Sequence, residues 1–308
     1  MKSLDIIIPV YNSEQSLGNL ITEILNEDSL KSYELGIILI NDGSKDESLE
    51  VCNSYSERFS QITVIDLMKN YGQHAALFAG ISYSRAELIV TMDDDGQHPP
   101  SAIATLLNSL TEELDVIYGL AAEEKHSWHR NLSSKIFKKV LFLGVGIRHG
   151  ESTSAFRAIR RITFEGIDFT SLSSSILEVA INWNTNRIGN VRVSMSKRVS
   201  GKSNYTFVKL LRFGTEMLTS YSIRPLRVAT LVGLLGFIGS LGLSFFYFIE
   251  ALTSGFKVEG FATLVVLITF LSSIQLITLG IFGEYLGKIH ERNIGKPHFV
   301  VRSVRNKG

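Results

Sequence analysis

Short apolar segments that alternate with amphipathic ones predict an α/β fold, with a doubly wound sheet, over about the first 200 residues. The acidic triplet Asp93-Asp94-Asp95 follows one of these segments, and two long apolar runs, residues 228–249 and 261–283, lie near the other end of the chain. Carboxylates spaced one residue apart at a strand end can hold a divalent cation against a phosphate, and apolar runs of this length can span a bilayer. The sequence therefore predicts chemistry on a phosphate-activated substrate at a membrane surface.

The predicted sheet domain alternates strands with helices. The first segment, residues 5–10, is an apolar run of strand length, as expected for a parallel strand that is buried on both faces. The same pattern recurs along the next 80 or so residues, which argues for parallel strands with crossover helices. The predicted strands are residues 5–10, 35–40, 62–67 and 88–92, and the predicted helices are residues 16–25, 47–59 and 73–83.

Each predicted strand is followed by a polar cluster. Any one cluster is a weak signal, because sequences such as Asn-Asp-Gly-Ser are common turns. Ligands bind at the carboxyl ends of strands in doubly wound sheets, so four clusters at that position predict a ligand site. The Gly-x-Gly-x-x-Gly of a dinucleotide fold is absent after the first strand, which disfavours NAD chemistry. The clusters are Tyr11-Asn12, Asn41-Asp42-Gly43-Ser44, Asn70-Tyr71-Gly72-Gln73-His74 and Asp93-Asp94-Asp95.

The two apolar runs are predicted transmembrane helices. Each has about 22 residues without a charge, enough to cover about 33 Å as a helix. Basic residues flank their outer ends, and the connector carries Glu250, Lys257 and Glu259. The positive-inside rule then places both termini in the cytoplasm and the connector on the opposite side. The flanking residues are Lys209, Arg212, Arg224, Arg227, Lys288, Arg292 and Lys296.

Residues 205–221 have apolar side chains near helical spacing, which predicts a helix lying in the membrane interface. An amphipathic helix packed on the sheet domain is the alternative. Glycines repeat in both apolar runs and predict close packing between the spans or between subunits, and so a possible homo-oligomer. These glycines are Gly233, Gly236, Gly239, Gly242, Gly280, Gly283 and Gly287.

The predicted organisation has four parts. A catalytic domain covers residues 1–204, an interfacial region 205–226, a transmembrane hairpin 227–287 and a cytoplasmic tail 288–308. The start of the chain lacks a signal-peptide pattern, so the catalytic domain is expected in the cytoplasm. The formal net charge of +1 argues against a nucleic-acid partner. The single cysteine, Cys52, excludes an intramolecular disulfide and is expected to be a packed thiol.

Several motifs resemble those of the inverting family 2 glycosyltransferases with a GT-A fold, a doubly wound mixed sheet. These motifs are Ile8-Pro9-Val10-Tyr11-Asn12, Asn41-Asp42-Gly43-Ser44 and Asp93-x-Asp95. Others, followed by two spans, resemble the polyprenyl-phosphate group, which includes dolichol-phosphate mannose synthases and bacterial undecaprenyl-phosphate sugar transferases. They are Asn70-Tyr71-Gly72-Gln73-His74, Asp95-x-Gln97-x-Pro99-Pro100, Phe156-Arg157-Ala158 and Arg198-x-x-Gly201-x-Ser203-x-Tyr205.

The resemblance implies a set of donor-side residues. Asp95, with Asp93 close by, is expected to hold Mg²⁺ or Mn²⁺ against the departing diphosphate. Asp94 is interpreted as a solvated or supporting carboxylate, and His98 as a turn residue before Pro99-Pro100. The expected catalytic residues are Asp93, Asp95 and Arg198, and the expected nucleotide-sugar contacts are Pro9, Tyr11, Asp42, Asn70, Gln73, Asp93 and Gln97.

An acceptor phosphate has different needs. A phosphate monoester is largely a dianion at neutral pH, so it needs positioning and positive charge rather than a general base. Arginine suits this because its planar fork binds phosphate oxygens in pairs. For Arg130, a solvated helix face is an equally good interpretation. The expected acceptor contacts are Arg130, Arg157, Arg198, Lys202 and Ser203.

The implied function is transfer of a hexosyl or pentosyl group from a nucleotide-sugar, by default a UDP-sugar, to undecaprenyl phosphate. The product would be a lipid-linked sugar for cell-envelope, O-antigen lipopolysaccharide or lipid A modification. The expected location is the inner membrane, with several spans among the membrane lipids and with both termini in the cytoplasm. GDP-mannose stays open as a donor. The alternatives are a processive polysaccharide synthase, whose Gln-x-x-Arg-Trp motif is absent, and a non-catalytic membrane-anchored nucleotide sensor.

Overall fold

The computed structural model describes residues 1–122, 153–167, 169, 176–194, 222–254, 260–295 and 297–306. The chain forms two compact units. The first, the sheet unit, comprises Met1–Phe142, Ile147–Asn204 and Lys296–Gly308. The second, the hairpin unit, comprises Leu143–Gly146 and Tyr205–Gly295. The predicted interfacial helix, residues 205–221, lies outside the described residues.

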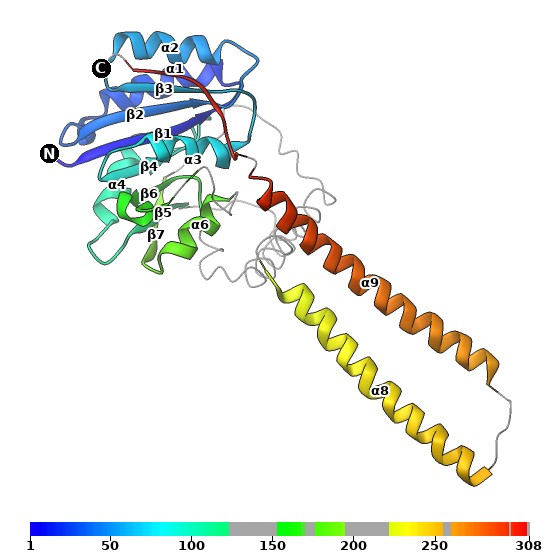
Figure 1. Cartoon of the computed structure of the whole chain (residues 1–308). Helices are drawn as coiled ribbons and strands as arrows, with labels where there is room; N and C mark the ends of the chain where they lie inside the picture. The colour runs from blue at the N-terminus through cyan, green and yellow to red at the C-terminus, as the bar shows by residue number, and fades with distance from the viewer. Residues whose placement is uncertain are drawn as a thin grey trace. The chain divides into compact units, whose positions relative to one another are not determined.

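A mixed sheet forms the centre of the sheet unit, with the strand order β7-β5-β6-β4-β1-β2-β3-β8 (Figure 1). Strand β1 pairs in parallel with β2 and β4, and β2 pairs in parallel with β3, as the alternating pattern predicts. Strands β6 and β8 run antiparallel to their neighbours. The strands are β1 (Ser3–Val10), β2 (Glu34–Asn41), β3 (Ile62–Leu67), β4 (Leu88–Thr91), β5 (Val116–Ala121), β6 (Arg157–Arg160), β7 (Ile188–Val193) and β8 (Val301–Arg305).

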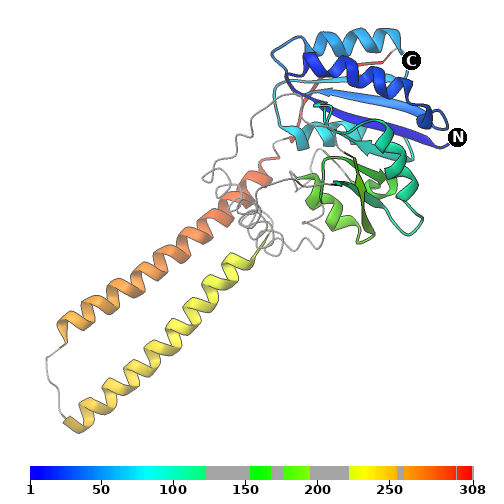
Figure 2. The same cartoon turned by 180° about the vertical axis from the view of Figure 1, so that it is seen from behind.

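Helices cover both faces of this sheet (Figure 1 and Figure 2). Side chains of α1, α2 and α4 pack in one buried cluster, and those of α3 and α6 pack in the other. Alternate residues of β1 serve the two clusters, with Ile6 and Ile8 in the first and Ile7 in the second. This explains why β1 is apolar throughout. The helices are α1 (Glu14–Asn26), α2 (Ser48–Arg58), α3 (Gln73–Tyr83), α4 (Ser101–Ser109) and α6 (Leu177–Asn184).

The end of the chain completes the sheet, although the sequence analysis placed residues 288–308 in a tail. Strand β8 lies antiparallel to β3, and the Met68 N–H donates to the Val300 carbonyl at 2.9 Å. Phe299 is buried in the cluster formed with α3 and α6. The outward side chains of β8 are polar or only moderately apolar, so the hydrophobic pattern predicts no strand there.

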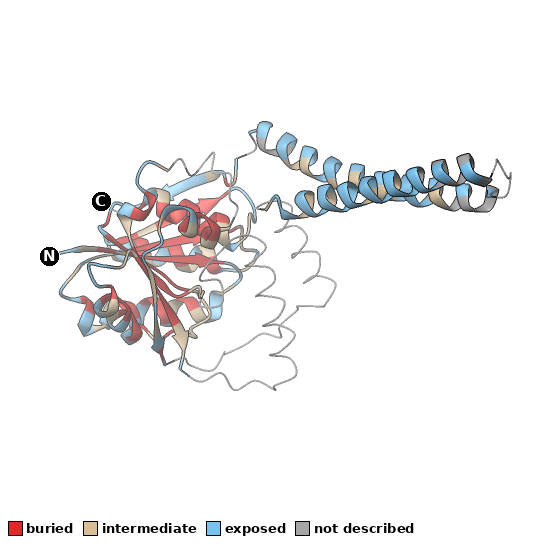
Figure 3. Ribbon diagram, turned by 90° about the horizontal axis from the view of Figure 1, so that it is seen from below, coloured by how far each residue is buried: buried red, intermediate tan, exposed pale blue. Residues whose placement is uncertain are grey.

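The hairpin unit contains two long helices, α8 (Arg224–Ser254) and α9 (Phe261–Asn293). Both are long and apolar enough to cross a membrane, with windows of mean hydropathy 1.8 and 1.2 that are not buried within the protein. Their described side chains are largely exposed (Figure 3). The predicted apolar helices are therefore confirmed, and α9 continues ten residues past the predicted run to Asn293.

The glycines of these helices do not mediate contact between α8 and α9. A methyl group added at any of the seven predicted packing glycines would meet no atom of the rest of the described chain within 4 Å. Helices that approach through glycine leave no such space. Glycine-mediated packing of the two spans is therefore absent from the described structure, and packing between subunits stays a prediction.

The burial of Phe299 makes the stability of the sheet unit depend on the last strand. We expect Phe299→Ala to lower the free energy of unfolding by about 3 kcal/mol, because it leaves a cavity beside α3. Val304→Ala, in β8 and 41% exposed, is the control and should cost less than about 1 kcal/mol. Urea unfolding of both detergent-solubilised variants measures this difference, and equal losses would contradict the expectation.

Candidate active site

Four loops meet at the carboxyl ends of β1 to β4, and we call this margin of the sheet the site edge. Its loops are residues 11–13, 42–47, 68–72 and 92–100. The Tyr11 N–H donates to Asp94 Oδ2 at 3.0 Å, which joins the first loop to the last. The N–H groups of Tyr71 and Gly72 donate to the two oxygens of Asp42 at 2.7 and 2.8 Å, which joins the second loop to the third. The polar clusters predicted to converge therefore do so.

Gly43 is required where the second and third loops cross. Its φ of +66° is a conformation that favours glycine, and a Cβ there would lie 2.6 Å from the Asn70 backbone nitrogen. On one side of it, Asn41 donates to Asp66 at 2.7 Å and accepts from the Ser44 N–H at 3.2 Å. The Asn-Asp-Gly-Ser cluster is thus a tightly packed crossing as well as a turn.

The three aspartates of the acidic triplet have different surroundings. Asp94 turns inward and accepts hydrogen bonds from the Tyr11 N–H and from the Ser13 hydroxyl. Burial raises the pKa of Asp94, and these hydrogen bonds offset part of that rise. The Ser16 hydroxyl also donates to the Asp94 carbonyl at 2.8 Å. Asp94 therefore supports the loop from behind.

Asp93 and Asp95 are held from the side by amides. Asp93 accepts a hydrogen bond from Gln73 Nε2 at 2.6 Å, and Asp95 accepts from Gln97 Nε2 at 2.6 Å and from the Gln97 N–H at 3.1 Å. Both carboxylates are partly exposed. Gln73 begins α3, so the position of Asp93 depends on where that helix starts.

The chemistry of the Asp93 and Asp95 carboxylates suits a divalent cation. The described residues contain no group of three or more His, Cys, Asp or Glu side chains that could hold a metal ion. Two hard oxygen donors match the chemistry of Mg²⁺ or Mn²⁺, whose remaining ligands would come from substrate phosphates and water. Asp93 and Asp95 are the side chains that would hold such an ion.

The expected nucleotide contacts differ in accessibility. Tyr11, Asn70 and Gln73 are exposed at the site edge, Gln97 is partly exposed, and Pro9 is buried in β1. Asp42 is only 3% exposed, and burial raises its pKa against the two backbone hydrogen bonds that lower it. Its described contacts organise the loop that carries Tyr71 and Gly72.

His98 lies behind Asp95 and is buried. Its ring stacks on Phe156 with a centroid separation of 4.7 Å. Neither ring nitrogen has a hydrogen-bond partner in the described part of the chain. Burial lowers the pKa of His98, while Asp95 opposes that shift. His98 packs as a neutral side chain, in addition to its place before the two prolines.

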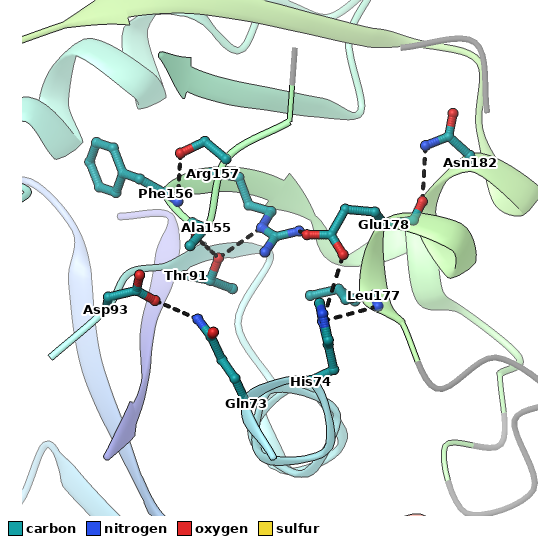
Figure 4. A network of polar contacts seen from close by, with 11 residues as sticks. Gln73, His74, Thr91, Asp93, Ala155, Phe156, Arg157, Leu177, Glu178 and Asn182 are labelled. Atoms are coloured by element: carbon teal, nitrogen blue, oxygen red, sulfur yellow. Dashed lines mark hydrogen bonds and ion pairs between the residues drawn. The ribbon is translucent and has the colours of Figure 1, made fainter. Parts of the chain in front are cut away.

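Arg157, an expected acceptor contact, is buried beside the site edge (Figure 4). Its Nη1 donates to Glu178 Oε1 at 2.9 Å, and its Nε donates to Thr91 Oγ1 at 3.1 Å. The guanidinium also lies over the Tyr118 ring, 5.6 Å from its centroid. Only 1% of the Arg157 side chain is exposed. Arg157 is therefore not the accessible phosphate contact expected from the sequence.

Glu178 was not identified from the sequence. It lies in the first turn of α6, within the apolar run Ile176-Leu177-Glu178-Val179-Ala180-Ile181. A single acid inside such a run is the available signal, because a buried carboxylate needs a partner. The other expected acceptor contacts, Arg130, Arg198, Lys202 and Ser203, lie outside the described residues.

A cavity of about 870 Å³ lies at the opposite ends of the strands, away from the site edge. Two arginines of its lining donate hydrogen bonds to backbone carbonyl oxygens of the segment after α4. Arg160 Nε donates to the Leu114 carbonyl at 3.0 Å, and Arg187 Nε donates to the Glu113 carbonyl at 2.6 Å. These arginines secure the segment after α4.

Comparison with known proteins adds family information to this geometry. The family model described as Glycosyl transferase family 2 matches residues 5–182. An uncharacterized glycosyltransferase of Synechocystis sp. is 31% identical over 302 residues, which cover 98% of this chain and 95% of that protein.

Solved structures share the fold of the sheet unit. Glucosyl-3-phosphoglycerate synthase from Mycobacterium tuberculosis in complex with UDP matches with a TM-score of 0.53 at 14% identity, over 71% of this chain and 79% of that one. The same enzyme with Mn²⁺, UDP and phosphoglyceric acid matches with a TM-score of 0.51 at 14% identity, over 71% and 77%. Together they confirm the predicted GT-A-like mixed sheet.

The loop crossing at Gly43 has a testable cost. We expect Gly43→Ala to destabilise the protein by about 1–2 kcal/mol from the backbone conformation and by about 1–3 kcal/mol more from the clash with Asn70. Gly166→Ala is the matched control, since its φ is +77° and its added methyl would meet no atom within 4 Å. Chemical denaturation of both variants separates the two costs, and similar losses would show that the crossing tolerates a side chain.

Proposed function

Because the chain belongs to glycosyltransferase family 2 and takes a sugar from a nucleotide-sugar, we propose that it delivers the sugar to a polyprenyl phosphate. The observation that carries this proposal is where the chain leaves and rejoins the sheet. Strand β7 is parallel to β5 and ends at the site edge with Val193. Strand β8 is antiparallel to β3 and begins at the same edge with Val301. In chain order, the two apolar helices come between these two strands.

This connectivity supports a defined membrane topology. Both ends of the hairpin unit lead into one folded sheet, because β7 and β8 are strands of it. A hairpin that spans a membrane twice then leaves both termini and the catalytic sheet on one side. The basic residues beyond the outer helix ends favour the cytoplasmic side. The proposed location is the bacterial inner membrane.

The donor chemistry follows from the acidic triplet. A Mg²⁺ or Mn²⁺ ion held by Asp93 and Asp95 would neutralise the charge that develops on the leaving diphosphate. Gln73 and Gln97 fix these two carboxylates, and Asp94 fixes the loop between them. The Mycobacterium tuberculosis enzyme was solved with UDP and Mn²⁺, which supports a UDP-sugar and a divalent cation here. The exposed Tyr11 ring is the proposed contact for the nucleotide base.

The acceptor chemistry places few demands on proton transfer. A lipid phosphate is already an anionic nucleophile, so the protein must orient it and offset its repulsion from the donor diphosphate. Arg130, Arg198, Lys202 and Ser203 are the proposed groups for that purpose. Arg157 is paired with Glu178, so we assign it no direct phosphate contact.

We expect purified full-length protein with Mn²⁺ and a UDP-sugar to release UDP when undecaprenyl phosphate is added, and to form a lipid-linked monosaccharide. A donor panel that includes GDP-mannose identifies the sugar, and mass spectrometry identifies the product. Asp95→Ala, which lacks a proposed metal ligand, should be inactive while folded. Arg198→Ala should weaken use of the lipid by roughly 10- to 100-fold with nucleotide binding retained, and Arg198→Lys should recover part of it.

Other products would redirect the assignment. Transfer to 3-phosphoglycerate with none to the lipid would exclude the polyprenyl phosphate, and a polymeric product would indicate a processive synthase. Loss of nucleotide affinity with normal lipid affinity in Arg198→Ala would move Arg198 to the diphosphate.

The topology can be tested with one engineered cysteine. Cys52 is buried and burial raises its pKa to about 12, so the native thiol should stay unlabelled. A membrane-impermeant maleimide should label Ser254→Cys, at the end of α8, from the periplasmic side of intact cells. Lys2→Cys, in the sheet unit, is the control and should react only after the membrane is opened. Labelling of Ser254→Cys from the cytoplasmic side alone would refute the proposed topology.

A further inference from the structure

Glu178 joins three elements beside the site edge (Figure 4). One carboxylate oxygen, Oε1, accepts from Arg157 Nη1 at 2.9 Å at the start of β6. The other, Oε2, lies 3.6 Å from His74 Nδ1 in the first turn of α3. Glu178 lies in the first turn of α6, so its side chain pairs that helix with β6 and lies close to α3.

Each partner of Glu178 leads to Asp93. His74 follows Gln73, whose side-chain amide donates to Asp93 Oδ1 at 2.6 Å. Arg157 faces Thr91 across the antiparallel pair of β4 and β6, and its Nε donates to Thr91 Oγ1. Thr91 in turn donates to the Ala155 carbonyl at 2.7 Å and lies two residues before Asp93. Residues close to Glu178 therefore approach Asp93 from two sides, Arg157 through Thr91 of β4 and His74 through Gln73 of α3.

Arg157 and Glu178 form an ion pair inside the protein. Arg157 has 1% of its side chain exposed, and Glu178 is the one acid ion-paired with it in the described part of the chain. A buried cation that loses its counter-charge is strongly destabilised and moves toward water or another anion.

The same contacts make Glu178 a poor proton acceptor. Burial alone would raise its pKa, but the Arg157 guanidinium lowers the pKa of Glu178 below its ordinary value. His74 Nδ1 accepts the Leu177 N–H at 3.4 Å, and this hydrogen bond joins α6 to α3. The carboxylate is held for pairing rather than for base catalysis.

We propose that Glu178 is a positioning residue that sets the placement of Asp93, by holding Arg157 against Thr91 at the site edge. The inference rests on the proposed function only in that Asp93 helps to hold a divalent cation and a nucleoside diphosphate. It does not depend on the acceptor.

The test measures Mn²⁺-dependent binding of UDP to the full-length chain without acceptor, or of GDP if wild type binds only GDP. Glu178→Gln is expected to weaken this binding by about tenfold, as is typical when a group that orients a metal ligand is lost. Gln73→Ala should weaken it similarly, and the double variant should lose little more than either single variant, because both act through Asp93. Asp115→Asn is the control: its side chain is 16% exposed, as is that of Glu178, and it pairs with Arg187 at the far edge of the sheet.

A second variant separates positioning from folding. Replacing the pair together, with Arg157→Met and Glu178→Leu, removes both buried charges and should preserve the unfolding midpoint. This pair variant is still expected to bind Mn²⁺ and UDP about tenfold more weakly.

Three results would overturn the proposal. The first is a pair variant that binds Mn²⁺ and UDP as tightly as wild type, and the second is a double variant, Glu178→Gln with Gln73→Ala, whose loss of binding is the sum of the two single losses. The third is a Glu178→Gln variant that binds normally but has no turnover, which would make Glu178 a catalytic base. Wild-type protein that binds Mn²⁺ and UDP but does not use polyprenyl phosphate would refute the proposed acceptor alone.

Discussion

Two inward-facing carboxylates, Asp42 and Asp94, hold the active-site edge together by accepting hydrogen bonds from backbone N–H groups of neighbouring loops. Loops at the ends of parallel strands have no ladder partners, so their backbone donors need other acceptors. Asp42 satisfies two donors of the third loop, and Asp94 satisfies one donor of the first. With these loops joined, Asp93 and Asp95 can remain partly exposed at fixed positions.

The three aspartates of the acidic triplet therefore have different hydrogen-bond partners. Asp94 accepts a hydrogen bond from the Ser13 hydroxyl and supports the loop, whereas the side-chain amides of Gln73 and Gln97 donate to Asp93 and Asp95. A chain that must hold a cation against a diphosphate benefits from carboxylates whose orientation is set before substrate arrives. The buried Arg157–Glu178 ion pair supports Asp93 in a similar way, because Arg157 lies opposite Thr91 at the end of β4, two residues before Asp93.

The last strand gives the apolar hairpin its relation to the enzyme. Had residues 297–306 been an unpaired tail, the hairpin would be attached to the sheet at one end. Because β8 pairs with β3 and Phe299 is buried, the chain returns to the sheet after the hairpin.

The sequence by itself determined the fold class, the four parallel strands β1 to β4, the two apolar helices and the convergence of the polar clusters. These features depend on local hydrophobic period and on strand direction, which are written in neighbouring residues. Only the tertiary structure decided that β8 joins the sheet, that Asp42 accepts from Tyr71, and that Arg157 is buried against Glu178. Each of these contacts joins residues far apart in the chain, and local pattern cannot tell which distant partner satisfies a charge. Arg157 shows this clearly, because its motif predicts a phosphate contact while its surroundings supply a carboxylate, a hydroxyl and an aromatic ring.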